Sequence, residues 1–537
     1  MPPGPANVRA RGRKKSRKVR AWRGVLRSKG KGFDPNAPPL ANLGPDMRVP
    51  RPSTTRYPID MAAFAKLKGA SATAKKLLKR ESVITPDKPG KAQRAAGRER
   101  MAAKPGPAAH VATLEPALNF AGISATGLIP PDCTLAAGPD HLLASVNPSI
   151  AVFSRLGGAP LLQRTLKEWF ANVVQDAFVF DPKALYDQHA GRWVLLAVAA
   201  AKDPDRSWFL LSVSTSSSPL DPWHNYALDA TQDGGVQTNN WVDYPAVGAD
   251  AHALYLTGNM FRFGGGFEYA KVRIVPKEGP YSGGTITFTD LVRLKNGDGS
   301  MAFTVQPCHI FGAPQVQYLV NTIYPEENAP ENKLSLWSIT DPLAESPTIS
   351  LQTIEVSPYG LPPDSIQQGE PNPLDTGDAR ILNAVFRGGS IWCAFATQHN
   401  WEEETNVAAI HWVQIEAASG VLIQQGIYGA KSSYYSYPAL MPNNNGDLIM
   451  VFSRCSATEF ASIGFTGRKA ADDLGTLRNS SILQPGAAGY LNLDDQGRNR
   501  WGDYAGIAAD PANPASVWFF SLFAVPGGWS TWIGSAS

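Results

Sequence analysis

The sequence Asp503-Tyr504-Ala505-Gly506-Ile507-Ala508-Ala509-Asp510, followed by the apolar run 516–522, contains the pattern that decides the fold. An acidic residue leads into a short apolar segment, a turn follows at Asp510-Pro511, and a second, more apolar segment comes next. Short apolar runs bounded by turn residues are typical of β-strands. The same order occurs in residues 243–250, which precede the apolar run 253–257. The stretch is therefore one copy of a repeat.

Seven such units follow one another from residue 132 to the end of the chain. We call the first residue of each unit its leading residue; the seven are Asp132, Asp181, Asp243, Gln306, Asp378, Ser436 and Asp503. Their mean spacing of about 62 residues leaves room for four short strands per unit. One unit cannot cover both faces of its own sheet, whereas a closed ring of units can. The repeat predicts an all-β fold, a β-propeller of seven four-stranded blades; insertions in residues 258–300 and 321–376 leave six or eight open.

The last unit has only three strand-like segments before the chain stops. Residues 114–123 precede the first unit and have a strand-like pattern. We expect them to supply the missing outer strand of the last blade and so to close the ring.

The net charge of +4 hides a division of the chain into two parts. Residues 1–110 contain 27 Lys and Arg against 6 Asp and Glu, a net charge of +21, and the remainder carries −17. Residues 1–57 are poor in aliphatic side chains and are predicted to be disordered. Residues 59–81 could form one short basic helix, and residues 84–112 form a linker. The predicted organisation is a basic, largely disordered extension over residues 1–112 and a propeller over residues 113–537.

The basic extension has two interpretations. Its run Arg11-Gly12-Arg13-Lys14-Lys15 and the basic residues after it could bind nucleic acid or another anionic surface through counterion release. Alternatively, it is a solvated tail, or sequence upstream of the true start codon.

Several classes of protein are excluded. No apolar run approaches the roughly 18–20 residues that span a bilayer, and the N-terminus lacks the apolar core of a secretory signal. The four cysteines, Cys133, Cys308, Cys393 and Cys455, form no CxxC pair and are expected to be buried thiols. GxSxG, P-loop and HExxH motifs are also missing from the sequence. Neither the compartment nor the oligomeric state can be assigned.

Several motifs resemble a family of bacterial sialidase-like, Asp-box-related propeller proteins over residues 113–537. They are Pro130-Pro131-Asp132, Ala137-Gly138-Pro139-Asp140-His141, Tyr186-Asp187 with Arg192-Trp193, Asp243-Tyr244-Pro245-Ala246-Val247-Gly248, Ala409-Ile410-His411-Trp412, and Arg500-Trp501-Gly502-Asp503-Tyr504 with Asp510-Pro511 and Trp518. The resemblance implies a propeller fold, and members usually look secreted or surface-exposed. This sequence has His411 in place of the usual Arg, and its nearest Asp box, residues 495–501, is one residue too long. The resemblance therefore supports the fold better than an activity.

The leading residues define the candidate site. In a propeller the first strand of each blade lines the central channel, so the leading residues are expected at one channel mouth. Five of the seven are Asp (Asp132, Asp181, Asp243, Asp378 and Asp503), and clustered carboxylates suit Ca²⁺ or a polyhydroxylated ligand. The candidate ligand-binding set adds Gln306, His309, Arg380, Arg500 and Trp501. Alternatively, each Asp only caps its own turn.

Sialidase chemistry needs a cluster of arginines around the substrate carboxylate. Only Arg380 and Arg500 are expected near this mouth, which is too few for that cluster. Other glycosidases need only two carboxylates at a suitable separation, and the candidates here are Asp132, Asp243 and Asp503. Trp241 and Trp501 could stack on sugar rings or pack in the core.

Three classes of function follow from these observations. The first is a recognition domain that binds a glycan or another polar ligand at an acidic channel mouth, with or without Ca²⁺. The second is a divergent glycoside hydrolase or lyase that uses paired carboxylates. The third is a bridging protein whose basic arm binds an anionic polymer while the propeller binds a partner.

Overall fold

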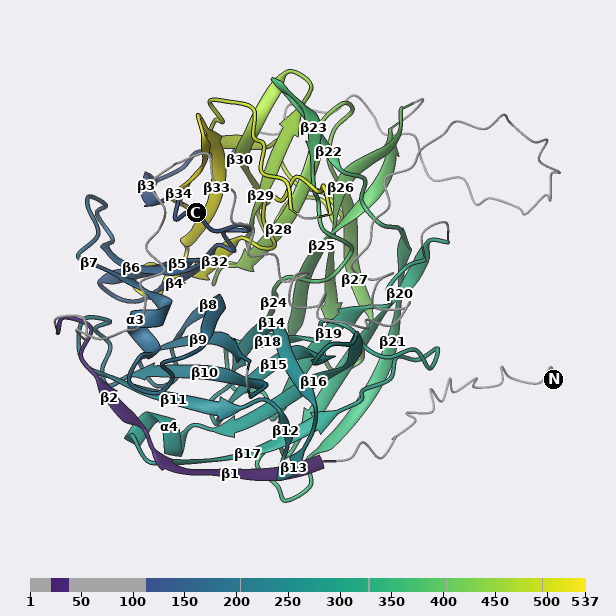
Figure 1. The fold of residues 1–537 in the computed structure, drawn as a ribbon. Helices are drawn as coiled ribbons and strands as arrows, with labels where there is room; N and C mark the ends of the chain where they lie inside the picture. The colour runs from purple at the N-terminus through teal and green to yellow at the C-terminus, as the bar shows by residue number, and fades with distance from the viewer. Residues whose placement is uncertain (1–20, 38–112, 203, 327–328, 402–403, 495) are drawn as a thin grey trace, which may run out of the picture.

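The chain forms a ring of seven β-sheet blades around a central channel (Figure 1). The computed structural model describes residues 21–37 and 113–537, apart from residues 203, 327–328, 402–403 and 495. Within these ranges the helices are two single turns, α3 (Leu166–Phe170) and α4 (Glu278–Ser282). No helix of the described residues is long and apolar enough to cross a membrane. The expected all-β propeller of seven blades is confirmed.

Each blade is an antiparallel sheet whose first strand lies nearest the channel. Blade one comprises β4 (Thr134–Ala137), β5 (His141–Val146), β6 (Ser149–Ser154) and β7 (Leu162–Thr165). Blade two comprises β8 (Phe178–Asp187), β9 (Arg192–Ala201), β10 (Arg206–Ser214) and β11 (Trp223–Asp229). Blade three comprises β14 (Asn240–Ala249), β15 (Ala253–Arg262), β16 (Phe267–Pro276) and β17 (Thr285–Val292). Blade four comprises β18 (Gln306–Ile310), β19 (Val316–Thr322), β20 (Glu331–Thr340) and β21 (Thr348–Tyr359). Blade five comprises β24 (Ala384–Arg387), β25 (Ser390–Trp401), β26 (Glu404–Glu416) and β27 (Leu422–Tyr428). Blade six comprises β28 (Tyr434–Pro442), β29 (Leu448–Ser456), β30 (Glu459–Arg468) and β31 (Ser481–Gln484).

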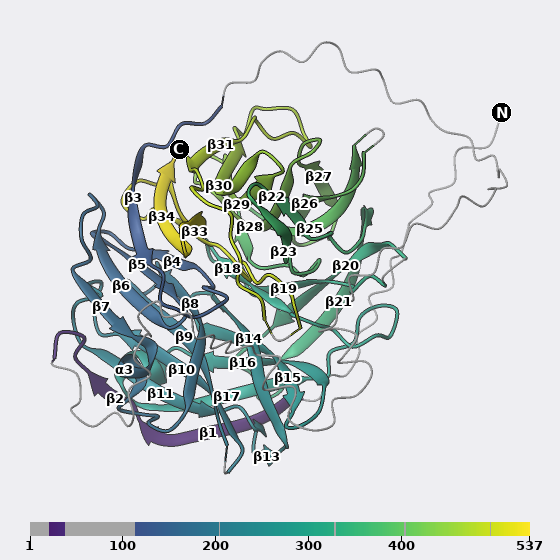
Figure 2. The same cartoon turned by 45° about the horizontal axis from the view of Figure 1, so that its top comes forward.

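The seventh blade joins the two ends of the ring. It contains β32 (Gly506–Ala509), β33 (Val517–Val525) and β34 (Gly528–Ala536), and its outer strand is β3 (Leu118–Ser124), which pairs antiparallel with β34 (Figure 2). Thr531 Oγ1 also donates a hydrogen bond to the Ile123 carbonyl at 2.6 Å. The expected closure of the ring by a segment that precedes the first unit is confirmed.

Blades four and five are fused at the channel. Their innermost strands β18 and β24 pair in parallel, with Cys308 opposite Ala384 and Ile310 opposite Phe386. Two short hairpins lie outside the blades: β12 (Gln232–Asp233) with β13 (Val236–Gln237), and β22 (Ser365–Gln367) with β23 (Glu370–Leu374). Side chains between the sheets form the core, and its largest members, such as Trp193 and Trp518, have less than 2% of their surface exposed. All four cysteines are buried and free, as expected.

Part of the basic N-terminal segment belongs to the propeller. Strand β1 (Ala21–Lys29) pairs antiparallel with β17, and β2 (Lys31–Phe33) pairs antiparallel with β11, so each adds a fifth strand to its blade (Figure 1). Trp22 and Leu26 pack against the core, and the Phe33 ring lies 4.7 Å from the Trp169 ring. The expectation of disorder is wrong for residues 21–33, because three well-spaced apolar side chains and two open sheet edges suffice to order them. The predicted helix over 59–81, the linker over 84–112 and the basic run before residue 21 lie outside the described residues.

Candidate functional site

The chain enters the innermost strands through an unusual backbone conformation. Asp132 and Asp181 have φ of 52°, and Tyr244 and Tyr437, each directly after a leading residue, have φ of 54° and 52°. In β8, β14 and β28 a β-bulge lies at the same place. Bulges redirect side chains, and positive φ at residues other than glycine costs energy that a functional or packing role offsets. The strain therefore marks one end of the channel in several blades.

Asn147 joins the first two leading aspartates. Its Nδ2 donates to Asp132 Oδ2 at 2.7 Å and to Asp181 Oδ1 at 3.4 Å, while its Oδ1 accepts from the Asp181 backbone N–H at 2.8 Å. Asp132 is only 1% exposed, and no group of the described residues donates a hydrogen bond to its Oδ1. A buried carboxyl oxygen without a donor favours the protonated form. Burial and the missing donor therefore both favour the protonated form of Asp132.

The carboxyl groups at this mouth raise one another's pKa values. Burial raises the pKa of Asp132 well above its usual range, and the nearby charges of Asp503 and Asp181 raise it further. Burial, followed by the charge of Asp181, also raises the pKa of Asp243. The pKa of Asp503 rises to about 6 through burial, although Arg500 and Arg380 oppose the shift. Because burial and mutual repulsion raise these pKa values, proton binding at one carboxyl group of the mouth affects the others.

Three cationic side chains lie among these carboxyl groups. The Lys183 nitrogen is 2.9 Å from the centroid of the Tyr504 ring, and the Arg380 guanidinium is 4.0 Å from that of Tyr244. Arg500 donates to Asp503 Oδ1 at 2.8 Å, and Arg380 binds Asp378 with both Nε and Nη2. Burial lowers the pKa of Lys183 to about 7, although Asp132, Asp181 and Asp503 act in the opposite direction.

Tyrosine hydroxyls connect blades that are distant in sequence across this mouth. Tyr244 donates to the Asp503 carbonyl at 3.2 Å, Tyr504 to the Pro182 carbonyl at 3.0 Å, and Tyr437 to the Asp375 carbonyl at 2.8 Å. Because these bonds join blades three, seven, two and six, they stabilise the position of each blade's leading residue.

The structure brings six of the predicted site residues close enough to act on one another electrostatically. They are Asp132, Asp181, Asp243, Asp503, Arg380 and Arg500. Asp378 joins them through Arg380. Gln306 and Ser436 are both buried; Gln306 is the first residue of β18 and Ser436 the third residue of β28. The catalytic roles suggested for Asp132, Asp243 and Asp503 remain predictions.

Three further candidate residues lie away from the carboxyl groups of this mouth, and the two tryptophans among them follow the alternative of packing in the core. Trp501 is fully buried, donates to Ser453 Oγ at 3.0 Å and packs on Tyr490, so it has no free face for a sugar ring. Trp241 is 2% exposed and packs against Phe261. His309 lies further along the channel, bonded to Gln188 Oε1 at 2.8 Å. The leading residues lie in the innermost strands or shortly before them, with Asp378 six residues before β24. Side-chain direction within a strand depends on packing that the repeat pattern does not contain.

Sequence reasoning missed Lys183, Asn147 and the tyrosines. One signal was present: a Tyr directly follows the leading residue at Tyr244, Tyr437 and Tyr504. Lys183 had no such signal, because it occurs in one unit only.

The fit of a calcium ion to this mouth is poor. The described residues include no group of three or more His, Cys, Asp or Glu side chains placed so that they could hold a metal ion. Lys183, Arg380 and Arg500 already supply positive charge among the carboxyl groups. Calcium binding remains a prediction for experiment.

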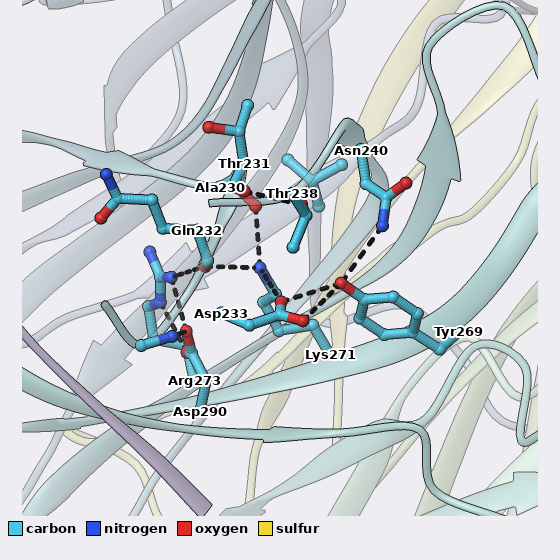
Figure 3. Close-up of polar contacts among 12 residues, drawn as sticks. Ala230, Thr231, Gln232, Asp233, Thr238, Asn240, Tyr269, Lys271, Arg273 and Asp290 are labelled. Atoms are coloured by element: carbon cyan, nitrogen blue, oxygen red, sulfur yellow. Dashed lines mark hydrogen bonds and ion pairs between the residues drawn. The ribbon is translucent and has the colours of Figure 1, made fainter. Parts of the chain in front are cut away.

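A second polar cluster lies in blade three, outside the channel (Figure 3). Lys271 donates to the carbonyls of Ala230 and Gln232 at 2.7 and 2.8 Å and lies 2.9 Å from Asp233 Oδ1. Tyr269 donates to the same Asp233 carboxylate at 2.8 Å. Beside them, Arg273 binds Asp290 through Nε and Nη2, both at 2.7 Å.

In this cluster every charged group is matched inside the protein. Arg273 and Asp290 have no exposed side-chain surface, and Asp290 Oδ2 also accepts from the Gly234 backbone at 2.8 Å. Such a cluster holds the β12–β13 hairpin against its blade and offers no free group to a ligand. The channel mouth differs from it because Asp132 Oδ1 receives no hydrogen bond from the part of the chain that the structure describes.

Comparison with known proteins gives no relative in sequence: no family model matches the chain, and no curated protein matches it. Among solved structures, the Hadza microbial sialidase Hz136 is 12% identical, with 76% of this chain and 74% of that chain covered and a TM-score of 0.37. The WD40 domain of SCAP from fission yeast is 10% identical (75% and 84% covered, TM-score 0.33). An α-L-arabinanase of Penicillium chrysogenum, complexed with arabinobiose, is 11% identical (66% and 92% covered, TM-score 0.30). These likenesses assign no activity to the chain.

Proposed function

We propose that this propeller binds a polyhydroxylated ligand of the glycan class at the mouth formed by its leading residues. The observation that carries the proposal is the convergence of Asp132, Asp181, Asp243 and Asp503 with three cationic side chains at one channel mouth. Carboxylates accept hydrogen bonds from sugar hydroxyls, and guanidinium groups donate to hydroxyl oxygens, so the combination suits a ligand that is rich in hydroxyl groups.

Solvent reaches this mouth through its outer members. The side chains of Asp503, Arg380 and Arg500 are 19%, 16% and 12% exposed. Asp132 and Asp181 lie beneath them and are nearly enclosed. A ligand would therefore contact Asp503, Arg380 and Arg500 first, and the buried pair would set the charge of the site.

The test is a glycan array probed with the full-length chain, followed by calorimetric titration of the best ligand. Asp503→Asn and Arg500→Gln are expected to weaken binding by about tenfold or more, because each loses a charge-assisted hydrogen bond worth about 1.5–3 kcal/mol. The matched control is Asp298→Asn, an exposed turn residue. No glycan bound by the wild type, or equal binding by all variants, would contradict the proposal.

The raised pKa values of Asp132 and Asp243 favour one second candidate, glycoside hydrolysis. A protonated carboxyl group can act as general acid, and an ionised carboxylate nearby can act as base or nucleophile. A fluorogenic glycoside panel separates the two candidates: turnover that disappears in both Asp132→Asn and Asp503→Asn would favour the enzyme, and binding without turnover would favour recognition.

A further inference from the structure

The central channel continues away from the acidic mouth as a cavity of about 310 Å³. Lys183 lines it near that mouth, while His309, Phe311 and Arg387 line it further along the innermost strands. Arg387 is the last residue of β24, so it lies at the opposite end of the strand from the mouth described above. Most of the remaining lining is apolar, with Val247, Val385 and similar side chains.

Arg387 is a largely buried guanidinium whose positive charge is not balanced by a carboxylate of the described residues. It stacks on the Phe311 ring, 3.8 Å from the centroid. Its Nε and Nη1 are enclosed and donate to no acceptor among the described residues. By contrast, Arg273 and Arg498 in the same propeller bind the carboxylates of Asp290 and Asp494 at 2.7 and 2.6 Å.

The groups around Arg387 do not replace a carboxylate. His309 bonds to Gln188 Oε1 at 2.8 Å, and burial lowers its pKa to about 3, so it is neutral at physiological pH. Asp510, which also lines the cavity, is already paired with Arg155 and accepts from Trp518 Nε1 at 2.9 Å. Burial lowers the pKa of Arg387 to about 10, which still leaves the guanidinium charged.

We propose that this end of the channel is a binding site for a small organic carboxylate, with Arg387 as its anchor. A buried charge without a partner is unfavourable, and an incoming carboxylate supplies both the opposite charge and hydrogen-bond acceptors. The apolar part of the ligand lies against Phe311 and Val385, where the lining is apolar. Inorganic phosphate fits less well, because a single guanidinium leaves part of its charge unbalanced and it has no apolar part.

This site differs from the proposed glycan site in position and in ligand. It lies at the other end of the channel and depends on a single cation, whereas the glycan site combines several carboxyl groups with three cations. Failure of one proposal therefore leaves the other standing.

The experiment titrates the full-length chain with benzoate, with benzyl alcohol as the neutral analogue and with inorganic phosphate, by calorimetry or saturation-transfer NMR. Saturable binding of benzoate at least about tenfold tighter than that of benzyl alcohol or phosphate is expected. Absence of saturable benzoate binding, or equal binding of the alcohol, overturns the proposal without any variant.

Variants then assign the site. Arg387→Gln is expected to weaken the affinity for benzoate by about tenfold or more. Arg387→Lys is expected to retain part of this affinity, because lysine keeps the charge but not the planar guanidinium. Arg192→Gln is the matched control, since Arg192 also lies at a hairpin between the first two strands of its blade but does not line the cavity. Unchanged binding by folded Arg387→Gln contradicts the assignment.

Discussion

The Lys183 ammonium group lies directly over the ring of Tyr504, 2.9 Å from its centroid, and joins the innermost strand of blade two to the seventh blade. The same amine is acted on electrostatically by Asp132, Asp181 and Asp503. Carboxyl groups from three blades and one lysine thus interact electrostatically at a single channel mouth.

Asp503 and Lys183 at this mouth are expected to make opposite contributions to the pH dependence of the protein's stability. Asp503 has a folded pKa of about 6 against its ordinary 3.8, so the folded state holds more protons between these values and loses stability as the pH rises through them. Lys183 has a folded pKa of about 7 against 10.5, so the unfolded state holds more protons there and stability rises between pH 7 and 10.

Urea unfolding at a series of pH values measures this dependence. Asp503→Asn is expected to remove about 1–3 kcal/mol of the free energy of unfolding that the wild type loses between pH 4 and 6. Lys183→Met is expected to remove a similar part of the free energy of unfolding that the wild type gains above pH 7. Asp298→Asn, in an exposed turn, is the control. Profiles of both variants that run parallel to the wild type would show that the mouth does not couple proton binding to folding.

The N-terminal strands are expected to stabilise blades two and three. Gly24 of β1 packs so closely on Phe288 that an added Cβ would lie 2.3 Å from the ring, whereas Gly32 of β2 has open space. Gly24→Val should therefore detach β1 and lower the free energy of unfolding by about 1–3 kcal/mol, while Gly32→Val should have little effect. Amide exchange in β1 and β17 is the direct measurement; equal protection in both variants would contradict the packing of β1.

The blade-three cluster is expected to be the most sensitive polar site for folding. Asp290→Ala leaves the fully buried Arg273 without its partner, which costs about 3–5 kcal/mol. Chemical unfolding of this variant beside Asp298→Asn measures the difference. If the free energy of unfolding falls by less than about 1 kcal/mol, the cluster rearranges around the missing carboxylate.

Calcium binding is tested on the leading aspartates themselves. If Ca²⁺ binds at the mouth, calorimetric titration of the wild type shows a signal that is lost in the Asp243→Ala/Asp503→Ala double variant. Because three cationic side chains lie among these carboxyl groups, we expect weak binding or none. A strong signal that disappears in the double variant would instead establish the mouth as a metal site.

The fold followed from the sequence because each blade repeats one order of strands and turns, and a repeat is visible without knowing its contacts. The same spacing placed five aspartates in the innermost strands or shortly before them, and it indicated that residues 114–123 close the ring. The basic composition of the N-terminal segment led to a wrong prediction of disorder for residues 21–33. The few apolar side chains that pack there, Trp22, Leu26 and Phe33, stand among lysines and arginines. Local composition does not show whether a sheet edge elsewhere in the chain is open to receive a strand.

The sequence by itself determined the blade order, the closure of the ring and the aspartates at the innermost strands, because these depend on local strand and turn preferences at regular spacing. The tertiary structure alone decided that Lys183 lies on Tyr504 and that Trp501 belongs to the core. It also decided that, among the described residues, Asp132 Oδ1 receives no hydrogen bond and Arg387 pairs with no carboxylate. These relationships join residues from different blades, and burial and charge pairing across a ring arise only when the blades are packed together.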